Sequence, residues 1–331
     1  MSFPFNVYLA ALVGSFLVAW AALPLWRTFC LRSGLVDDPG HRKIHDQPVP
    51  LAGGFAVLTG MVAPLLLGAA VVYGSLANLP QSQPLLEHGF AVRKTELTAI
   101  VLGAFVIVLT GLLDDKYELR PAFKFGGQLL AAALVVSAHV RITLFVHSII
   151  FSYAISLLWI LTVINAFNFM DNMNGLCAGL GAISAWFFGM FAASDGQYLV
   201  ALLALLSCGS LLGFLPYNFP KASAFLGDTG SHLTGYLLAV MAILPHFSTA
   251  QHPRHWAVLV PLIILAVPLG DLAWVVLLRW RLGKPFYQGD NNHLSHRLVK
   301  RGFARRDAVL LIWLLAALSG CAGLALMLLS E

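Results

Sequence analysis

The chain alternates between long apolar segments and short polar ones along its whole length. An apolar run of about 20 residues is long enough for a helix to cross a bilayer. Because lipid cannot hydrogen-bond an exposed backbone, runs this long and continuous predict helices. The pattern predicts about ten spanning helices over about 5–26, 51–74, 96–113, 124–140, 149–168, 174–193, 197–217, 230–247, 256–280 and 308–329. We therefore expect an all-α, polytopic membrane bundle that forms a single domain over residues 1–331.

Composition supports a membrane protein. Only 11% of the residues are charged and 59% are hydrophobic, whereas soluble domains carry roughly 25% charged residues. The four cysteines, Cys30, Cys177, Cys208 and Cys321, are scattered without metal-type spacing, and we expect small buried side chains. No basic residue precedes the first apolar run, which predicts an uncleaved first helix whose N-terminus lies outside the cytoplasm.

Lysine and arginine are concentrated on one predicted side of the membrane. With the N-terminus outside, the inside loops are 27–50, 114–123, 169–173, 218–229 and 281–307. Together with Lys124 and Arg279 at the membrane edge, these loops hold 16 of the 20 basic side chains. This bias predicts that both termini are outside and that the polar loops face the cytoplasm. The net charge of +5 then reflects topology and attraction to membrane lipid and phosphate, and it does not require nucleic acid.

The polar clusters all lie on this inner face, and the clearest is the adjacent pair Asp114–Asp115 after an uncharged apolar run. A helix C-terminus disfavours anions by up to about 1 kcal/mol, so the pair needs a counter-charge. Two interpretations remain close: an interfacial ion-pair cluster with Lys116 and Arg120, or a site for a hard cation. The second interpretation fits Mg²⁺, which binds one or two carboxylates together with substrate phosphate oxygens.

Two further clusters allow a similar choice. Asn165, Asn168 and Asp171 repeat along one helix face, where they either hydrogen-bond between helices or line a site. Asp228 lies in the segment Leu226–Ser231, where it either caps a helix or holds a metal on a phosphate at a helix N-terminus.

The remaining polar segments are basic. Arg42, Lys43 and His45 lie in a loop with prolines and a glycine pair. This loop is either a basic inside loop that follows the positive-inside rule or an anion-binding loop. His293, His296 and Arg297 begin a segment that either lies on anionic lipid or clamps a nucleotide diphosphate; a zinc site ranks low because a third ligand is missing. Asp271, inside an apolar run, is expected to be structural and paired, with Arg279 as a candidate partner.

In this order and on one face, these segments resemble the polyprenyl-phosphate N-acetylhexosamine-1-phosphate transferase family from about Gly34 to Arg306. The matching patterns are Arg-Lys-x-His-x-x-Pro-x-Pro-x-x-Gly-Gly at Arg42–Gly54, Asp114-Asp115 with Leu119 and Lys124-Phe125, Asn-Ala-x-Asn-x-x-Asp at Asn165–Asp171, and Leu-Gly-Asp-x-Gly-Ser at Leu226–Ser231. Two departures stand out. The family usually continues Asp-Gly-x-Asp-Gly-Leu where this chain has Asp171-Asn172-Met173-Asn174-Gly175-Leu176, and its closing loop usually has three histidines where this chain has His293-Leu294-Ser295-His296.

The resemblance implies an enzyme of the bacterial inner membrane that transfers a sugar-1-phosphate from a UDP-N-acetylhexosamine, by default UDP-GlcNAc, to undecaprenyl phosphate with release of UMP. This is the first membrane step of a cell-envelope polysaccharide. The implied cofactor is Mg²⁺, with Mn²⁺ as an alternative. The implied metal ligands are Asp228, Asp171 and Asp115, and the implied catalytic residues are Asp114, Asp115 and Asp228. The implied substrate-binding residues are Asn168, Asp171, Lys124, His293, His296 and Arg297, with Arg42, Lys43 and His45 as weaker candidates.

Two other functions are weighed against this one. A transporter with an acidic cation path would place carboxylates deep in several spans, whereas Asp271 is the one acid well inside an apolar run. A catalytically altered homologue that binds lipid or nucleotide sugar is compatible with Asn174 and Ser295 at the departures. The sequence leaves the sugar, the lipid length, the pathway and the oligomeric state open, and a homodimer is compatible with it.

Overall fold

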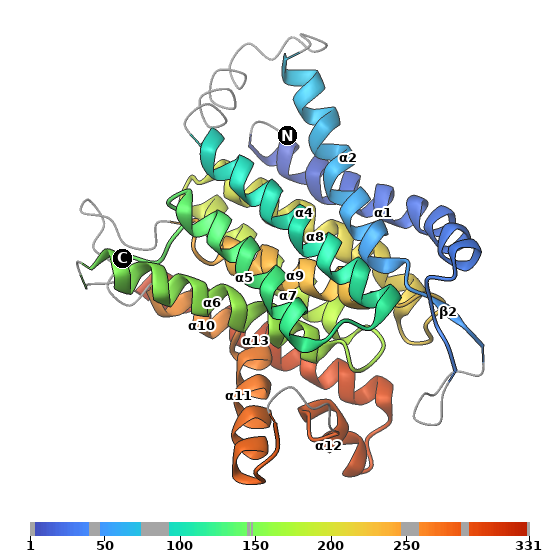
Figure 1. The fold of residues 1–331 in the computed structure, drawn as a ribbon. Coiled ribbons are helices and arrows are strands. Elements are labelled where there is room, and N and C mark those ends of the chain that lie inside the picture. The colour runs from blue at the N-terminus through green and yellow to red at the C-terminus, as the bar shows by residue number, and fades with distance from the viewer. Residues whose placement is uncertain are drawn as a thin grey trace.

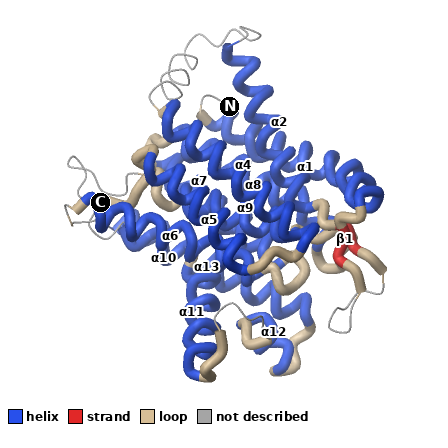
Figure 2. The backbone as a smooth tube through the Cα atoms, in the orientation of Figure 1, coloured by secondary structure: helices blue, strands red, loops and turns tan. Residues whose placement is uncertain are grey.

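The described part of the chain is almost entirely helical (Figures 1 and 2). The computed structural model describes residues 4–39, 47–73, 93–143, 146, 148–245, 258–285 and 291–329. The helices are α1 (Phe5–Ser33), α2 (Gly53–Tyr73), α4 (Lys94–Tyr117), α5 (Pro121–Ser137), α6 (Ile149–Met170), α7 (Leu176–Ser194), α8 (Tyr198–Asn218), α9 (Gly227–Met241), α10 (Val260–Ile264), α11 (Ala266–Arg281), α12 (Leu294–Lys300) and α13 (Arg305–Leu329). Two short strands, β1 (Val36–Asp37) and β2 (Val49–Pro50), pair antiparallel with Val36 opposite Pro50.

Seven helices within the described ranges are long and apolar enough to span a membrane: α1, α2, α4, α6, α7, α8 and α13. The predicted count of about ten is therefore not confirmed. The predicted span 124–140 overlaps α5, a shorter apolar helix of 17 residues, and 230–247 overlaps α9, which has 15 residues. The ninth predicted span is broken at Leu265 into α10 and α11. Hydropathy marks the apolar segments but does not show where a helix breaks or turns away.

Local chemistry explains several helix ends. Helix α1 ends at Gly34, whose φ of 69° lies in the left-handed region where glycine has no Cβ penalty. Helix α5 begins with Pro121, whose missing N–H is not needed in a first turn. The Ser148 hydroxyl accepts a hydrogen bond from the Phe151 amide and so caps α6. These residues mark where α1 ends and where α5 and α6 begin.

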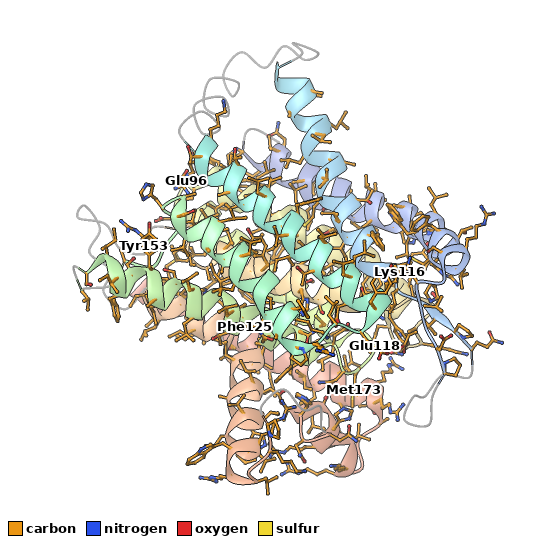
Figure 3. All side chains as sticks on the ribbon, viewed as in Figure 1. Glu96, Lys116, Glu118, Phe125, Tyr153 and Met173 are labelled. Atoms are coloured by element: carbon orange, nitrogen blue, oxygen red, sulfur yellow. The ribbon has the colours of Figure 1, made fainter. Side chains whose placement is uncertain are left out.

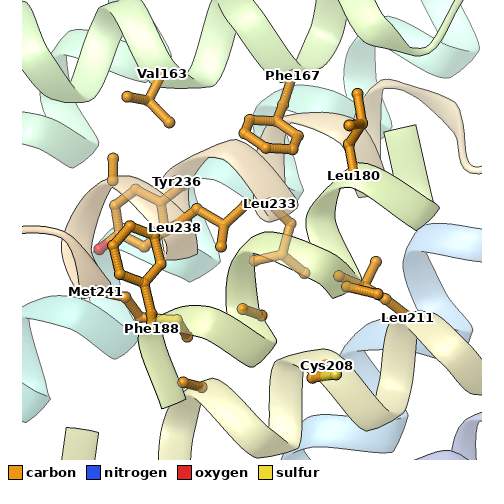
Figure 4. Close-up of a cluster of buried hydrophobic side chains, with 14 of the residues drawn as sticks. Val163, Phe167, Leu180, Phe188, Cys208, Leu211, Leu233, Tyr236, Leu238 and Met241 are labelled. Carbon is orange, nitrogen blue, oxygen red and sulfur yellow. The ribbon is translucent and has the colours of Figure 1, made fainter. Parts of the chain in front are cut away.

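The centre of the bundle is α9, which packs against α2, α4, α6, α7 and α8. Figure 1 shows it enclosed by longer helices, while α11 leaves the bundle and α12 lies beside it below. Around α9 the core is apolar, and Figure 4 shows Phe167, Leu233 and Tyr236 within it. The Tyr236 hydroxyl meets the Ile100 carbonyl at 2.9 Å, which satisfies the polar tip of this buried ring.

Individual side chains can be placed along the bundle and relative to its interior. In Figure 3, Lys116, Glu118 and Met173 lie at one end of the bundle and Glu96 lies at the other. Of the cysteines, Cys30, Cys177 and Cys208 are buried as expected, but Cys321 is exposed on α13. The expectation of four buried cysteines is therefore wrong for Cys321, because an apolar segment of a membrane bundle need not face the interior.

Candidate active site

The acid pair at the end of α4 meets the N-terminus of α9. Asp115 Oδ1 accepts a hydrogen bond from the Asp228 amide at 2.7 Å, and Oδ2 accepts from the Thr229 amide at 3.0 Å and from the Thr229 hydroxyl at 2.7 Å. A carboxylate at this position satisfies two helix-start amides and complements the helix dipole. The helix cap that the sequence suggested for Asp228 is therefore supplied by Asp115 from another helix.

Close backbone contacts hold α9 in this place. A Cβ on Gly111 would lie 2.5 Å from Thr229 Cα, so α4 reaches α9 only because that residue is glycine. On the other side, the Gly53 and Gly54 amides donate to the Phe225 and Leu226 carbonyls at 2.9 and 3.0 Å. Gly53 and Gly54 thus fix the segment that leads into α9.

Lys124 on α5 joins Asp114 to Asp228. Its ammonium pairs with Asp114 Oδ2 and lies 3.2 Å from Asp228 Oδ2. The Lys124 and Asp228 side chains are 32% and 28% exposed, whereas the Asp114 side chain is 2% exposed. A substrate can therefore reach Lys124 and Asp228, and the structure places Asp114 behind them as a buried partner of the lysine.

Helix α6 supplies the next wall. Asn168 Nδ2 donates to Asp228 Oδ1 at 2.8 Å and to the Ser231 hydroxyl at 3.2 Å, which orients the aspartate. Asp171 follows the last turn of α6 and is half-buried. Burial, together with the negative charges of Asp228 and Asp115, raises the pKa of Asp171 to about 8. A bound cation would stabilise the charged form of Asp171 against this burial and repulsion.

The structure places Asn165 one turn deeper, away from the site. Its Nδ2 donates to Gln128 Oε1 at 2.8 Å, and Gln128 Nε2 lies 3.5 Å from His232 Nε2. Gln128 and His232 follow Lys124 and Asp228 by four residues, so they lie on the same helix faces. The sequence analysis did not single out these two buried residues, although their four-residue spacing from Lys124 and Asp228 could have identified them.

The histidine segment is tied to α11. His293 is buried; its Nδ1 lies 2.7 Å from Asp271 Oδ2, and the Leu294 amide donates to Asp271 Oδ1 at 2.6 Å. These contacts confirm that Asp271 is paired, with His293 as the partner the geometry defines. Burial and the charges of His293, Lys300 and Arg305 lower the pKa of His296, which favours a neutral imidazole there.

The other predicted basic residues divide into two groups. Arg297 stacks its guanidinium over the Trp274 ring at 4.5 Å, which holds it against α11. Arg42, Lys43 and His45 lie outside the described residues, so their predicted substrate contacts stay predictions.

The donor set fits Mg²⁺ through two carboxylates. Among the described residues, no group of three or more His, Cys, Asp or Glu side chains is arranged to hold a metal ion. Mg²⁺ does not need three such ligands, because it retains waters and takes phosphate oxygens from a substrate. Asp228 and Asp171 meet this requirement. Both Asp115 oxygens accept hydrogen bonds from backbone amides that are fixed in α9, whereas the Asp228 oxygens are contacted by the side chains of Lys124 and Asn168. This difference favours a positioning role for Asp115 over the predicted metal-ligand role.

Fold and site together define a multi-pass membrane protein with a polar, carboxylate- and lysine-lined site at one end of its helices. The sequence model of Glycosyl transferase family 4 matches residues 97–246, which include the acid pair, Lys124, Asn168, Asp171 and Asp228. Full-length relatives extend the match along the chain, and the protein belongs to this family.

Three relatives illustrate the similarity. The chain is 33% identical over 313 residues to a "Probable undecaprenyl-phosphate N-acetylglucosaminyl 1-phosphate transferase" of Bacillus subtilis (strain 168), covering 92% of this chain and 81% of that protein. It is 33% identical over 331 residues to a "Decaprenyl-phosphate N-acetylglucosaminephosphotransferase" of Mycolicibacterium smegmatis, covering 92% and 77%. It is 27% identical over 325 residues to an "Undecaprenyl-phosphate alpha-N-acetylglucosaminyl 1-phosphate transferase" of Yersinia pestis, covering 94% and 82%.

Proposed function

We propose that this protein transfers N-acetylglucosamine-1-phosphate from UDP-GlcNAc to a polyprenyl phosphate, by default undecaprenyl phosphate, and releases UMP. The names of the relatives support this reaction. The observation that carries it is the placement of Asp228, which is partly exposed at the start of α9 and is contacted by Lys124 and Asn168. Family membership makes the protein an enzyme rather than a transporter.

The chemistry requires two phosphorylated substrates to approach each other. Negative charge must be neutralised and the reacting groups must be held in line. Lys124 can turn its ammonium from Asp228 toward a phosphate while it stays paired with Asp114, so the buried acid keeps its partner. Asn168 fixes Asp228 Oδ1, and Asp115 fixes the helix from which Asp228 projects. Asp114 then acts through Lys124 to orient the lipid phosphate.

Asp228 and Asp171 are the residues that would hold Mg²⁺. The metal, when bound, supplies the positive charge that stabilises the phosphoryl oxygens and the leaving UMP. Asp171 and Asn168 then lie at the nucleotide end, and the neutral His296 is available as a hydrogen-bond donor to the diphosphate.

The setting follows from the substrates. A polyprenyl chain stays in the bilayer while its phosphate reaches the polar surface, and the UDP-sugar comes from the aqueous side. We place the enzyme in a bacterial inner membrane with this site facing the cytoplasm, at the first membrane step of an envelope polysaccharide. A homodimer stays a prediction, as does the choice of GlcNAc over other N-acetylhexosamines.

The test is UMP release by the purified protein with undecaprenyl phosphate, Mg²⁺ and a panel of UDP-N-acetylhexosamines. We expect turnover with UDP-GlcNAc, its loss in EDTA, and a lipid product whose mass includes one GlcNAc-1-phosphate. Asp228→Ala should abolish turnover, while Asp307→Ala, at an exposed aspartate of α13, should not. Full turnover by Asp228→Ala would refute the assignment of this aspartate.

Asn174 and Ser295 differ from the family pattern, so the test must also distinguish a homologue that binds its substrates without catalysis. Asn174 Nδ2 donates to the Pro220 carbonyl at 3.3 Å, a contact that an aspartate could not make. Metal-dependent binding of UDP-GlcNAc without UMP release from any sugar in the panel would favour a catalytically altered binding protein.

A further inference from the structure

The closing loop, residues 293–296, forms the start of α12 and is fastened on two sides. On one side, Asp271 of α11 binds His293 and the Leu294 amide. On the other side, the Ser295 hydroxyl donates a 2.6 Å hydrogen bond to Asn172 Oδ1 in the turn between α6 and α7. Residues 293–295 therefore connect α11 to the turn that carries Asp171.

The Asn172–Ser295 contact is partly buried, with the serine inside and the asparagine half-buried, and it continues into α6. Ser295 is 1% exposed, so its hydroxyl has no water to replace a lost partner. Asn172 uses its Nδ2 to donate to the Phe169 carbonyl at 2.6 Å, which leaves its Oδ1 for the serine. The Phe169 ring lies 5.5 Å from the His293 ring and 5.0 Å from the Arg279 guanidinium. The last turn of α6 is thus the surface on which the closing loop rests.

The two partners occupy positions at which this chain differs from the family pattern given above. That pattern has glycine where this chain has Asn172 and histidine where it has Ser295. A glycine offers no side-chain acceptor to a serine. An imidazole is larger than the serine side chain, whose oxygen already lies 2.6 Å from Asn172. The bond between residues 172 and 295 is therefore specific to the pair that this chain carries.

We infer that Asn172 and Ser295 are a positioning pair that holds the closing loop against the Asp171 turn and so sets the apparent affinity for the UDP-sugar. The inference rests on the proposed function, because the UDP-sugar is the ligand that reports it. Without the bond, the loop must become ordered when substrate binds. The apparent dissociation constant then equals the intrinsic one divided by the fraction of molecules whose loop is in the binding-competent state. The rate at saturating substrate is unchanged.

The test is a double-mutant cycle with Ser295→Ala, Asn172→Ala and the combined variant. Each single change should raise the KM for UDP-GlcNAc by about tenfold, the equivalent of one buried hydrogen bond, with kcat within about twofold. The combined variant should be no worse than either single one. Ser295→Thr, which keeps a hydroxyl, should restore a KM near that of the unchanged protein. Ser210→Ala is the matched control, since this buried hydroxyl donates to the Ser207 carbonyl of its own helix.

A second cycle exchanges the pair for the family residues. Ser295→His alone should raise KM further than Ser295→Ala, and adding Asn172→Gly should recover most of the loss. Multiplicative effects in the alanine cycle, or a Ser295→Ala variant that behaves like Ser210→Ala, would overturn the inference.

Failure of the proposed function is recognised separately. If the unchanged protein releases no UMP from any UDP-sugar, the reaction is wrong, and the same variants are compared by thermal unfolding. Equal falls in Tm for both single variants, with no further fall in the combined one, would still support the fastened loop. Additive falls in Tm would refute it.

Discussion

Replacing Asp115 with asparagine removes one negative charge at the start of α9 and hardly changes side-chain size. The remaining oxygen can still accept from the Asp228 amide, and the Thr229 hydroxyl can turn to accept from the new Nδ2. The Thr229 amide, however, then faces a donor and loses its acceptor. An unsatisfied buried donor costs about 1–3 kcal/mol, and loss of an anion from a helix N-terminus costs roughly 0.3–2 kcal/mol. We expect Asp115→Asn to destabilise the protein by about 2–4 kcal/mol.

The assay separates capping from metal binding. Thermal unfolding of the detergent-purified protein, followed by intrinsic fluorescence, should give a Tm several degrees lower for Asp115→Asn, both in Mg²⁺ and in EDTA. Asp307→Asn is the matched control, because it neutralises an exposed aspartate in the first turn of α13. Remaining UMP release should need the same Mg²⁺ concentration for half activation as in the unchanged protein.

The opposite pattern would refute this reasoning. If Asp115→Asn unfolded at the same temperature as Asp307→Asn in EDTA and needed much more Mg²⁺ for activity, Asp115 would be a metal ligand. The hydrogen bonds to α9 would then contribute little to stability.

Lys124→Met should cost about 3–5 kcal/mol by leaving the buried Asp114 carboxylate without its cation; in thermal unfolding, adding Asp114→Asn should recover part of this loss, and no recovery would contradict the pairing. Gly111→Ala should push α4 from α9 and lower UMP release by roughly a hundredfold, whereas Gly126→Ala, which meets no described atom within 4 Å, should leave it unchanged. Asp171 has a folded-state pKa of about 8, above its unfolded value, so the folded protein binds more protons between about pH 4 and pH 8. In EDTA the Tm should therefore fall as pH rises through that window, and a slope that persists in Asp171→Asn would assign the effect to another group.

Much of the architecture could be predicted from the sequence because a bilayer imposes a local rule. A segment of about 20 apolar residues must be helical wherever it lies in the membrane. Each predicted span accordingly overlaps a helix, and the acid pair, Asn168–Asp171 and Asp228 lie at or beside helix ends. The break at Leu265 and the shortness of α9 were not predicted, because they depend on packing within the bundle and not on hydropathy.

The contacts of individual carboxylates were decided only by the tertiary structure. Asp114 and Asp115 are adjacent and equivalent in the sequence, but successive side chains on a helix point about 100° apart. Asp115 therefore meets the α9 amides, while Asp114 turns toward Lys124. Likewise, Asp228 resembled a helix cap until α4 supplied that cap and left its carboxylate for Lys124 and Asn168. The sequence determined which polar groups lie at or beside the helix ends. Which group faces which partner depends on the rotation and close packing of separate helices, and that geometry has no local signal.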